Sequence, residues 1–145
     1  MKIGIMGGTF DPIHIGHLIL AERVRDSKEL DQVIFIPTGV NPLKKDKNIS
    51  SSVHRLEMLR LAIESNPYFS ISTIEIERGG LSYTIDTLRA LRVKYKDDDL
   101  YFIIGSDIIF QLEKWKDFKE LFKLCKFILV DRPGNEYKEI DEKIQ

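Results

Sequence analysis

Cysteine is nearly missing from this chain of 145 residues, which contains only Cys125. A lone cysteine cannot form an internal disulfide, and no group of Cys and His at metal-ligand spacing accompanies it. Long apolar runs are missing too, since no stretch approaches the roughly 20 apolar residues of a membrane span. The N-terminus also lacks the apolar core of a signal peptide. These absences argue against a disulfide-stapled or membrane-spanning protein and predict a location in the reducing cytoplasm.

The chain also lacks an excess of charge of either sign. Its 22 Lys and Arg nearly balance its 23 Asp and Glu, giving a formal net charge of -1, while 43% of the residues are hydrophobic. Disorder requires the opposite combination, so residues 1–145 are expected to fold as a single domain. Without a positive field, binding to a nucleic-acid backbone is not expected. Small anionic ligands remain compatible with this composition.

Short apolar runs alternate along the chain with longer segments of helical period. The predicted strands are Lys2–Met6, Gln32–Ile36, Phe69–Glu75, Leu100–Ile104 and Lys126–Val130. The predicted helices are Ile15–Glu29, Val53–Ser65, Thr84–Tyr95 and Ile108–Leu124; residues 136–145 are compatible with a further helix, after which no strand is predicted. In the second helix the apolar residues share one face, and charged residues such as Arg55 lie off it. This order predicts an α/β fold, a doubly wound, Rossmann-like parallel sheet of about five strands.

Doubly wound sheets bind ligands at the carboxyl ends of their strands, where the strand order reverses. The loop after the first predicted strand, from Gly7 to His17, is the most informative one. Its adjacent glycines let a ligand approach the backbone closely, and the next helix presents N–H groups and a positive dipole end. Phosphate suits such a turn. The spacing matches neither the GxGxxG dinucleotide fingerprint nor a P-loop, because no GK[ST] follows.

His14 and His17 stand three residues apart at the start of the second predicted element, so both project from one face of a helix. Two imidazole donors aimed at one phosphate could neutralise charge that builds up during phosphoryl or nucleotidyl transfer. Two alternatives remain for such a pair, namely a surface or capping role and metal ligation without an evident third ligand. The preceding strand and glycines favour phosphate.

The segment Gly8-Thr9-Phe10-Asp11-Pro12-x-His14-x-Gly16-His17 resembles the signature of the nucleotidyltransferases that share an HxGH element with class I aminoacyl-tRNA synthetases. Within that group the chain is most similar to the bacterial nicotinate-nucleotide adenylyltransferase family. Further matches follow in order over nearly the whole chain: Pro42-Leu43-Lys44, Ser51–Arg55, Arg78–Leu88, Gly105-Ser106-Asp107, Trp115 and Arg132-Pro133-Gly134. The resemblance implies transfer of the adenylyl group of ATP to nicotinate mononucleotide, with Mg²⁺ accompanying ATP, in NAD biosynthesis.

The resemblance also implies roles for individual residues. His14, His17 and Lys44 would be catalytic by neutralising phosphate charge; for Lys44 the alternative is a solvated basic turn. Asp107 would accept hydrogen bonds from the ATP ribose. The residues expected to bind ATP are Gly7, Gly8, Thr9, Phe10, His14, His17, Gly105, Asp107 and Arg132.

The expected nicotinate-nucleotide site consists of Ser82, Tyr83, Thr84 and Trp115. The region of Thr84 would bind the nicotinate carboxylate through hydroxyl and N–H groups, and Trp115 would stack on the pyridine ring. The alternatives are helix capping by Ser82 and Thr84, and a place for Trp115 in the core. Cys125 is interpreted as a core residue.

The chain departs from the family at its C-terminal end. Nothing after Gly134 matches the family's Ser/Thr-rich turn and Arg, which would bind ATP phosphates, so a truncated chain with exposed apolar surface and a tendency to self-associate is expected. Two rival functions stay open. One is another adenylyltransferase of this fold, such as the phosphopantetheine type, and the other is a nucleotide-binding module with little turnover.

Overall fold

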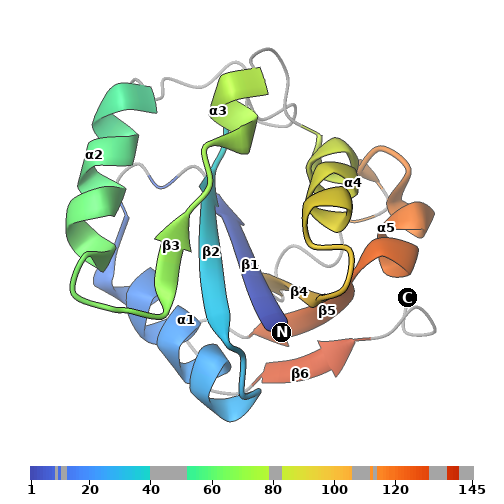
Figure 1. The fold of residues 1–145 in the computed structure, drawn as a ribbon, viewed down its shortest axis with the longest axis horizontal. Coiled ribbons are helices and arrows are strands. Elements are labelled where there is room, and N and C mark those ends of the chain that lie inside the picture. Colours follow the sequence, from blue (N-terminus) through green and yellow to red (C-terminus); the bar gives the residue numbers. More distant parts are fainter. Residues whose placement is uncertain are drawn as a thin grey trace.

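The computed structural model describes residues 1–8, 10, 13–39, 52–78, 83–105, 112, 114–130 and 137–140. Its six-stranded sheet has the order β3-β2-β1-β4-β5-β6 (Figure 1). The strands are β1 (Lys2–Gly8), β2 (Gln32–Pro37), β3 (Phe69–Ile71), β4 (Asp99–Gly105), β5 (Lys126–Val130) and β6 (Tyr137–Ile140). The helices are α1 (Ile15–Ser27), α2 (Ser52–Ile63), α3 (Ile74–Arg78), α4 (Thr84–Lys94) and α5 (Phe118–Leu124). Within those described ranges, no helix combines the length and the apolar character that crossing a bilayer requires.

The first five strands are parallel, which confirms the predicted fold class. β1 lies at the centre of the sheet and pairs with β2 on one side and with β4 on the other. β3 extends the sheet beyond β2, and β5 extends it beyond β4. The strand order therefore reverses between β1 and β4, and this junction is where doubly wound sheets bind ligands.

Helices cover both faces of the sheet (Figure 1). In β2, Val33 and Phe35 belong to a buried cluster with residues of α1 and α2, whereas Ile34 and Ile36 belong to a second cluster with residues of α4 and α5. Successive side chains of a strand point to opposite faces, so α1 and α2 lie on one face and α4 and α5 on the other. Burial on both faces explains why the strands are continuously apolar runs.

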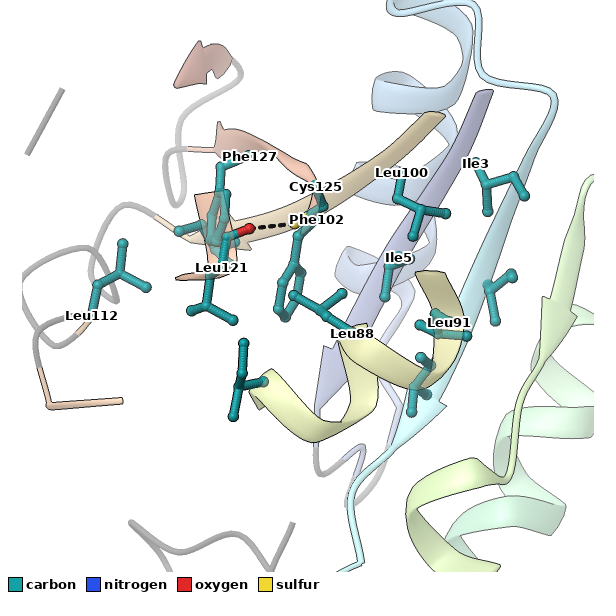
Figure 2. Close-up of a cluster of buried hydrophobic side chains, with 14 residues drawn as sticks. Ile3, Ile5, Leu88, Leu91, Leu100, Phe102, Leu112, Leu121, Cys125 and Phe127 are labelled. Carbon is teal, nitrogen blue, oxygen red and sulfur yellow. Dashed lines mark hydrogen bonds between the residues drawn. The ribbon is translucent and has the colours of Figure 1, made fainter. Parts of the chain in front are cut away.

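The cluster on the α4 and α5 face contains Cys125 (Figure 2). The Cys125 side chain is buried, and its Sγ lies 3.7 Å from the carbonyl oxygen of Leu121. Burial raises the pKa of the thiol to about 12, so the reactive thiolate is scarce at neutral pH. The prediction that Cys125 is a core residue is confirmed.

The prediction of a strand over Phe69–Glu75 is wrong beyond Ile71, because the chain turns into the short helix α3. The hydroxyl of Ser72 accepts a hydrogen bond from the N–H of Ile74 at 3.3 Å, and the Thr73 hydroxyl donates to the Glu77 carboxylate. These side chains satisfy groups at the start of a helix, where Ser and Thr are favoured. Local bonding by Ser72 and Thr73 thus outweighs the apolar alternation that predicted a longer strand.

Arg55 was expected to lie off the apolar face of its helix and to be exposed, and this expectation is wrong. The side chain is only 3% exposed, and its Nη1 donates to the carbonyl oxygen of Thr38 at 2.8 Å. The N–H of Thr38 in turn donates to the carbonyl oxygen of Gly8 at 2.9 Å. A backbone acceptor within reach of the guanidinium explains its burial, and the contact joins α2 to the carboxyl ends of β1 and β2.

The C-terminal part of the chain also differs from the prediction. Residues 137–140, expected to be compatible with a helix, form β6, which pairs antiparallel with Phe127–Val130 of β5. A strand at a sheet edge offers unpaired backbone groups, which a returning segment can satisfy. Of the helix predicted over Ile108–Leu124, the described part is α-helical from Phe118 only, after an Asp117 N-cap with φ of 52°, while Leu112 and Lys114 have 3₁₀ geometry.

Gly4 in β1 is expected to be required for close packing. An added Cβ would lie 2.8 Å from Cδ1 of Leu30 and 3.3 Å from Cδ1 of Ile103, both of which are buried. Gly4→Ala should therefore lower the free energy of unfolding by about 1–3 kcal/mol, as overpacked cores do. Urea denaturation would measure this loss.

Gly16→Ala is the matched control for this substitution, because nothing lies within 4 Å of the Cβ position at Gly16. The control should leave stability unchanged or raise it by up to about 1 kcal/mol. Equal stability of the Gly4→Ala variant and the unmodified chain would contradict the packing argument.

Candidate functional site

The strands on either side of the reversal point are not paired with each other along their whole length. The ladder between β1 and β4 ends at Ile5 and Phe102. Beyond that point β1 pairs with β2 up to Gly8 and Pro37, and β4 pairs with β5 up to Gly105 and Val130. The carboxyl ends of the two central strands are thus held by their outer neighbours, which places Gly7, Gly8 and Gly105 at the junction where a ligand is expected.

Phe10 fixes the turn that leaves β1. Its backbone is left-handed, with φ of 50°, and its side chain is 4% exposed. A Cβ at Gly8 would lie 3.2 Å from the Phe10 ring, so glycine leaves room for this ring. The ring stands edge-on to His17 with centroids 5.4 Å apart. Phe10 therefore supports the imidazole of His17 from the core side, while only its backbone is available to frame a ligand.

His14 and His17 are brought together at the start of α1. His14 is the N-cap residue, and its N–H donates to Nδ1 of His17 at 3.0 Å. The two rings are 5.0 Å apart at an interplanar angle of 78°. With Nδ1 acting as an acceptor, the neutral ring of His17 carries its proton on Nε2, where it can donate. The capping alternative is thus part of the structure, and it fixes the tautomer that a phosphate ligand needs.

The first turn of α1 contains two further features that suit an anion. It has no acidic residue, so no side chain of that turn neutralises the positive end of this 13-residue helix. Gly16 lies in the same turn, and an added Cβ would meet nothing within 4 Å, so packing does not require glycine there. Glycine in a helix costs stability. We therefore add Gly16 to the candidate site as a position kept open for a ligand, a role that its place in the sequence motif alone did not specify.

Two of the four residues predicted for the nicotinate nucleotide, Tyr83 and Thr84, lie at the start of α4. Tyr83 occupies the N-cap position and Thr84 is the first residue of the helix, so the capping alternative does not hold for Thr84, while Ser82 lies outside the described residues. Tyr83 and Trp115 pack on the same buried cluster, and Nζ of Lys116 lies 4.9 Å from the centre of the Tyr83 ring. Trp115 is half-buried, with its ring 6.1 Å from that of Phe102. Its packing is compatible with both the core and the stacking interpretation.

A buried polar cluster joins α3 to α4 and was missed by sequence reasoning. The Thr87 hydroxyl donates to Oε2 of Glu75 at 2.7 Å and accepts from Nη2 of Arg78 at 2.6 Å. Thr87 is 3% and Glu75 7% exposed. Thr87 lies one turn before Leu91 on the apolar face of its helix, and a polar residue on such a face needs a partner. The position of Thr87 on this apolar face is the sequence signal that could have revealed the cluster.

Five of the predicted site residues lie outside the described part of the chain: Thr9, Lys44, Ser82, Asp107 and Arg132. An open groove of ≈ 710 Å³ lies elsewhere, between the end of β3, α3 and α4. None of the predicted nucleotide-binding residues within the described part of the chain lines this groove, so the candidate site remains at the carboxyl ends of β1 and β4 and at the starts of α1 and α4.

Comparison with known proteins identifies the class. The profile of the cytidylyltransferase-like family matches residues 5–144 of the chain. Over 145 residues, 99% of this chain and 69% of the relative, it is 47% identical to the "Probable nicotinate-nucleotide adenylyltransferase" of Thermoanaerobacter sp. (strain X514). It is 50% identical over 133 residues to the nicotinate-nucleotide adenylyltransferase of Bacillus subtilis (strain 168), covering 92% of this chain and 70% of the relative. The chain belongs to the nicotinate-nucleotide adenylyltransferase family of these nucleotidyltransferases.

Solved structures agree on the fold. The nicotinic acid mononucleotide adenylyltransferase of Plasmodium falciparum, complexed with NaAD, superposes with a TM-score of 0.79 at 23% sequence identity. The match covers 99% of this chain and 69% of the Plasmodium chain. The relatives are thus longer than this sequence, of which they match nearly the whole length.

Proposed function

We propose that this chain transfers the adenylyl group of ATP to nicotinate mononucleotide, forming nicotinate adenine dinucleotide and pyrophosphate in NAD biosynthesis. The observation that carries the proposal is its 47–50% identity to nicotinate-nucleotide adenylyltransferases along 92–99% of the chain. In the reaction, a phosphate oxygen of the mononucleotide forms a bond to the α-phosphorus of ATP. The bond from that phosphorus to the bridging oxygen of the β-phosphate breaks, and pyrophosphate leaves with the electron pair.

This reaction requires neither a side-chain nucleophile nor a general base, because the attacking phosphate oxygen is already ionised. Catalysis then depends on positioning and on neutralising the charge that builds up on the phosphates. Nε2 of His17 and the N-terminal end of α1 supply donors and a positive dipole at one place. From the family resemblance we assign His14 and Lys44 to the same phosphates. The backbone around Thr9 would frame the nucleotide, Arg132 would bind ATP, and Asp107 would bind the ribose.

We assign the nicotinate nucleotide to the start of α4. Here the N–H groups and hydroxyl of the Thr84 region would receive the carboxylate, and Ser82 and Tyr83 would flank it. Trp115 would present the ring face that is not against Phe102 to the pyridine ring. A half-buried tryptophan held on one side by another aromatic side chain suits a flat, electron-poor ring.

We also propose that Mg²⁺ enters the site with ATP. The side chains at the start of α1 are imidazoles, whereas Mg²⁺ prefers oxygen ligands such as the phosphates themselves. The ion would neutralise part of the triphosphate charge. A cytoplasmic location of the chain is a further proposal, drawn from its lone cysteine.

Pyrophosphate release tests the proposed function directly. The chain is mixed with MgATP and either nicotinate mononucleotide, nicotinamide mononucleotide or phosphopantetheine, and the products are identified by mass spectrometry. We expect pyrophosphate and nicotinate adenine dinucleotide in equal amounts with the first substrate. Release only with phosphopantetheine would favour the rival adenylyltransferase, and ATP binding without release would favour a binding module.

His17→Ala is expected to lower turnover by roughly 10²- to 10³-fold, the effect of losing one preorganised donor to a developing charge. The free energy of unfolding should fall by only about 1 kcal/mol, because one helix-start hydrogen bond is lost. Initial rates and urea denaturation would measure the two effects.

His54→Ala is the matched control for His17→Ala, since His54 is an exposed histidine of α2. Its turnover should stay close to that of the unmodified chain. Near-normal turnover of His17→Ala, or a melting transition far below that of the control, would make His17 a purely structural residue.

Trp115→Ala is expected to raise the KM for nicotinate mononucleotide about 5- to 150-fold, corresponding to the 1–3 kcal/mol that stacking typically contributes. The KM for ATP should change little. Trp115→Phe keeps a flat ring and should restore most of the affinity. Equal losses for both substrates would instead assign Trp115 to the core.

A further inference from the structure

We infer that Glu75, Thr87 and Arg78, here called the α3–α4 triad, position the start of α4 for the nicotinate nucleotide. The inference rests on the proposed function, because it concerns the same site. None of the three residues is assigned to ligand contact here. Their role would be to hold the backbone of Tyr83 and Thr84 where the carboxylate binds.

The Thr87 hydroxyl is the centre of the triad. It has one proton and three polar neighbours: Oε2 of Glu75 at 2.7 Å, Nη2 of Arg78 at 2.6 Å and the carbonyl oxygen of Tyr83 at 3.5 Å. The guanidinium can only donate, so the hydroxyl accepts from Arg78. Its own proton goes to Oε2 of Glu75, which is nearer than the carbonyl oxygen of Tyr83. The bond from the Arg78 guanidinium involves a charged group, which makes it stronger than a neutral hydrogen bond.

The triad lies at the first turn of α4. The backbone N–H of Thr87 donates to the carbonyl oxygen of Tyr83 at 3.3 Å, which closes the first turn of α4. Thr87 thus connects the N-cap residue to α3 through both its backbone and its side chain. Helix α3 has only five residues, too few to be stable alone, so contacts with its surroundings must fix its direction.

The two ends of the segment between α3 and α4 both belong to this arrangement. Arg78 is the last residue of α3, and Tyr83 is the N-cap of α4. A carboxylate ligand at the start of α4 depends on the direction of the first N–H groups, and small displacements of such groups are costly for binding. Loss of the triad should therefore weaken the binding of the nicotinate nucleotide and leave the binding of ATP unchanged.

ATP offers an internal reference for this selectivity. Its predicted phosphate site is at the start of α1, and α1 packs on the opposite face of the sheet from α4. A change at Thr87 should not reach that helix. A general loss of stability, in contrast, would affect both substrates through the fraction of folded protein.

The test compares Thr87→Val with Thr87→Ser. Valine has nearly the shape of threonine but no hydroxyl, whereas serine keeps the hydroxyl and serves as the conservative control. For each variant we would measure kcat, the KM values for both substrates and the melting temperature. Binding of nicotinate mononucleotide would be followed through the fluorescence of Trp115, the single tryptophan of the chain.

We expect Thr87→Val to raise both the KM and the Kd for nicotinate mononucleotide by roughly tenfold, as when one buried partner of a hydrogen bond is removed. The KM for ATP should stay within about twofold, and Thr87→Ser should behave like the unmodified chain. Arg78→Met is the second variant if Thr87→Val does not fold. Arg78 is exposed, so this change removes the guanidinium with little risk to folding and should raise the same two constants.

Three outcomes would overturn the inference. Unchanged binding of nicotinate mononucleotide by a folded Thr87→Val or Arg78→Met variant would do so. So would equal losses for both substrates, or a Thr87→Ser variant as weak as Thr87→Val. Failure of the proposed function alone would give a different result, in which the unmodified chain binds the mononucleotide but releases no pyrophosphate. If the unmodified chain binds no nicotinate mononucleotide, the inference and the proposed function both fail.

Discussion

The position of β1 between β2 and β4 is the constraint on which the rest of the structure depends. Because β2 and β3 lie on one side of β1 and β4 and β5 on the other, the strand order reverses between β1 and β4, whose shared ladder ends at Ile5 and Phe102. Gly4 allows this crowded centre, since a Cβ there would lie 2.8 Å from Leu30. The reversal also sends α1 to one face of the sheet and α4 to the other. The N-terminal ends of two helices on opposite faces therefore both belong to the candidate site at the carboxyl ends of the strands.

This arrangement explains how a chain without a reactive nucleophile can belong to a family of transferases. Each substrate is assigned to one helix start, ATP to α1 and the nicotinate nucleotide to α4, and the attacking oxygen comes from the second substrate. The residues that matter are then those that hold groups in place. Phe10 supports His17, His14 fixes its tautomer, and the α3–α4 triad holds the N-cap of α4. The one thiol is buried and protonated, outside this chemistry.

Much of the fold could be predicted because apolar periodicity directly reflects burial on two faces. β5 has the predicted bounds of Lys126–Val130, and α1 and α4 begin at the predicted Ile15 and Thr84. The site residues at the starts of these helices were predicted from the glycine-rich segment before α1 and from the family resemblance. The misses among buried polar residues have one physical origin. Arg55, Glu75 and Thr87 are polar residues buried by partners distant in sequence, and periodicity counts such residues as exposed.

The most direct test of the central claim is the state of His17 with and without MgATP, observed by ¹H–¹⁵N correlation spectra of the imidazole rings. The chain has three histidines, so their signals can be assigned by single substitutions. We predict that His17 carries its proton on Nε2, and that the His14 and His17 signals move when MgATP is added while the His54 signal does not. A proton on Nδ1 of His17, or signals of His14 and His17 that ignore saturating MgATP, would contradict the account.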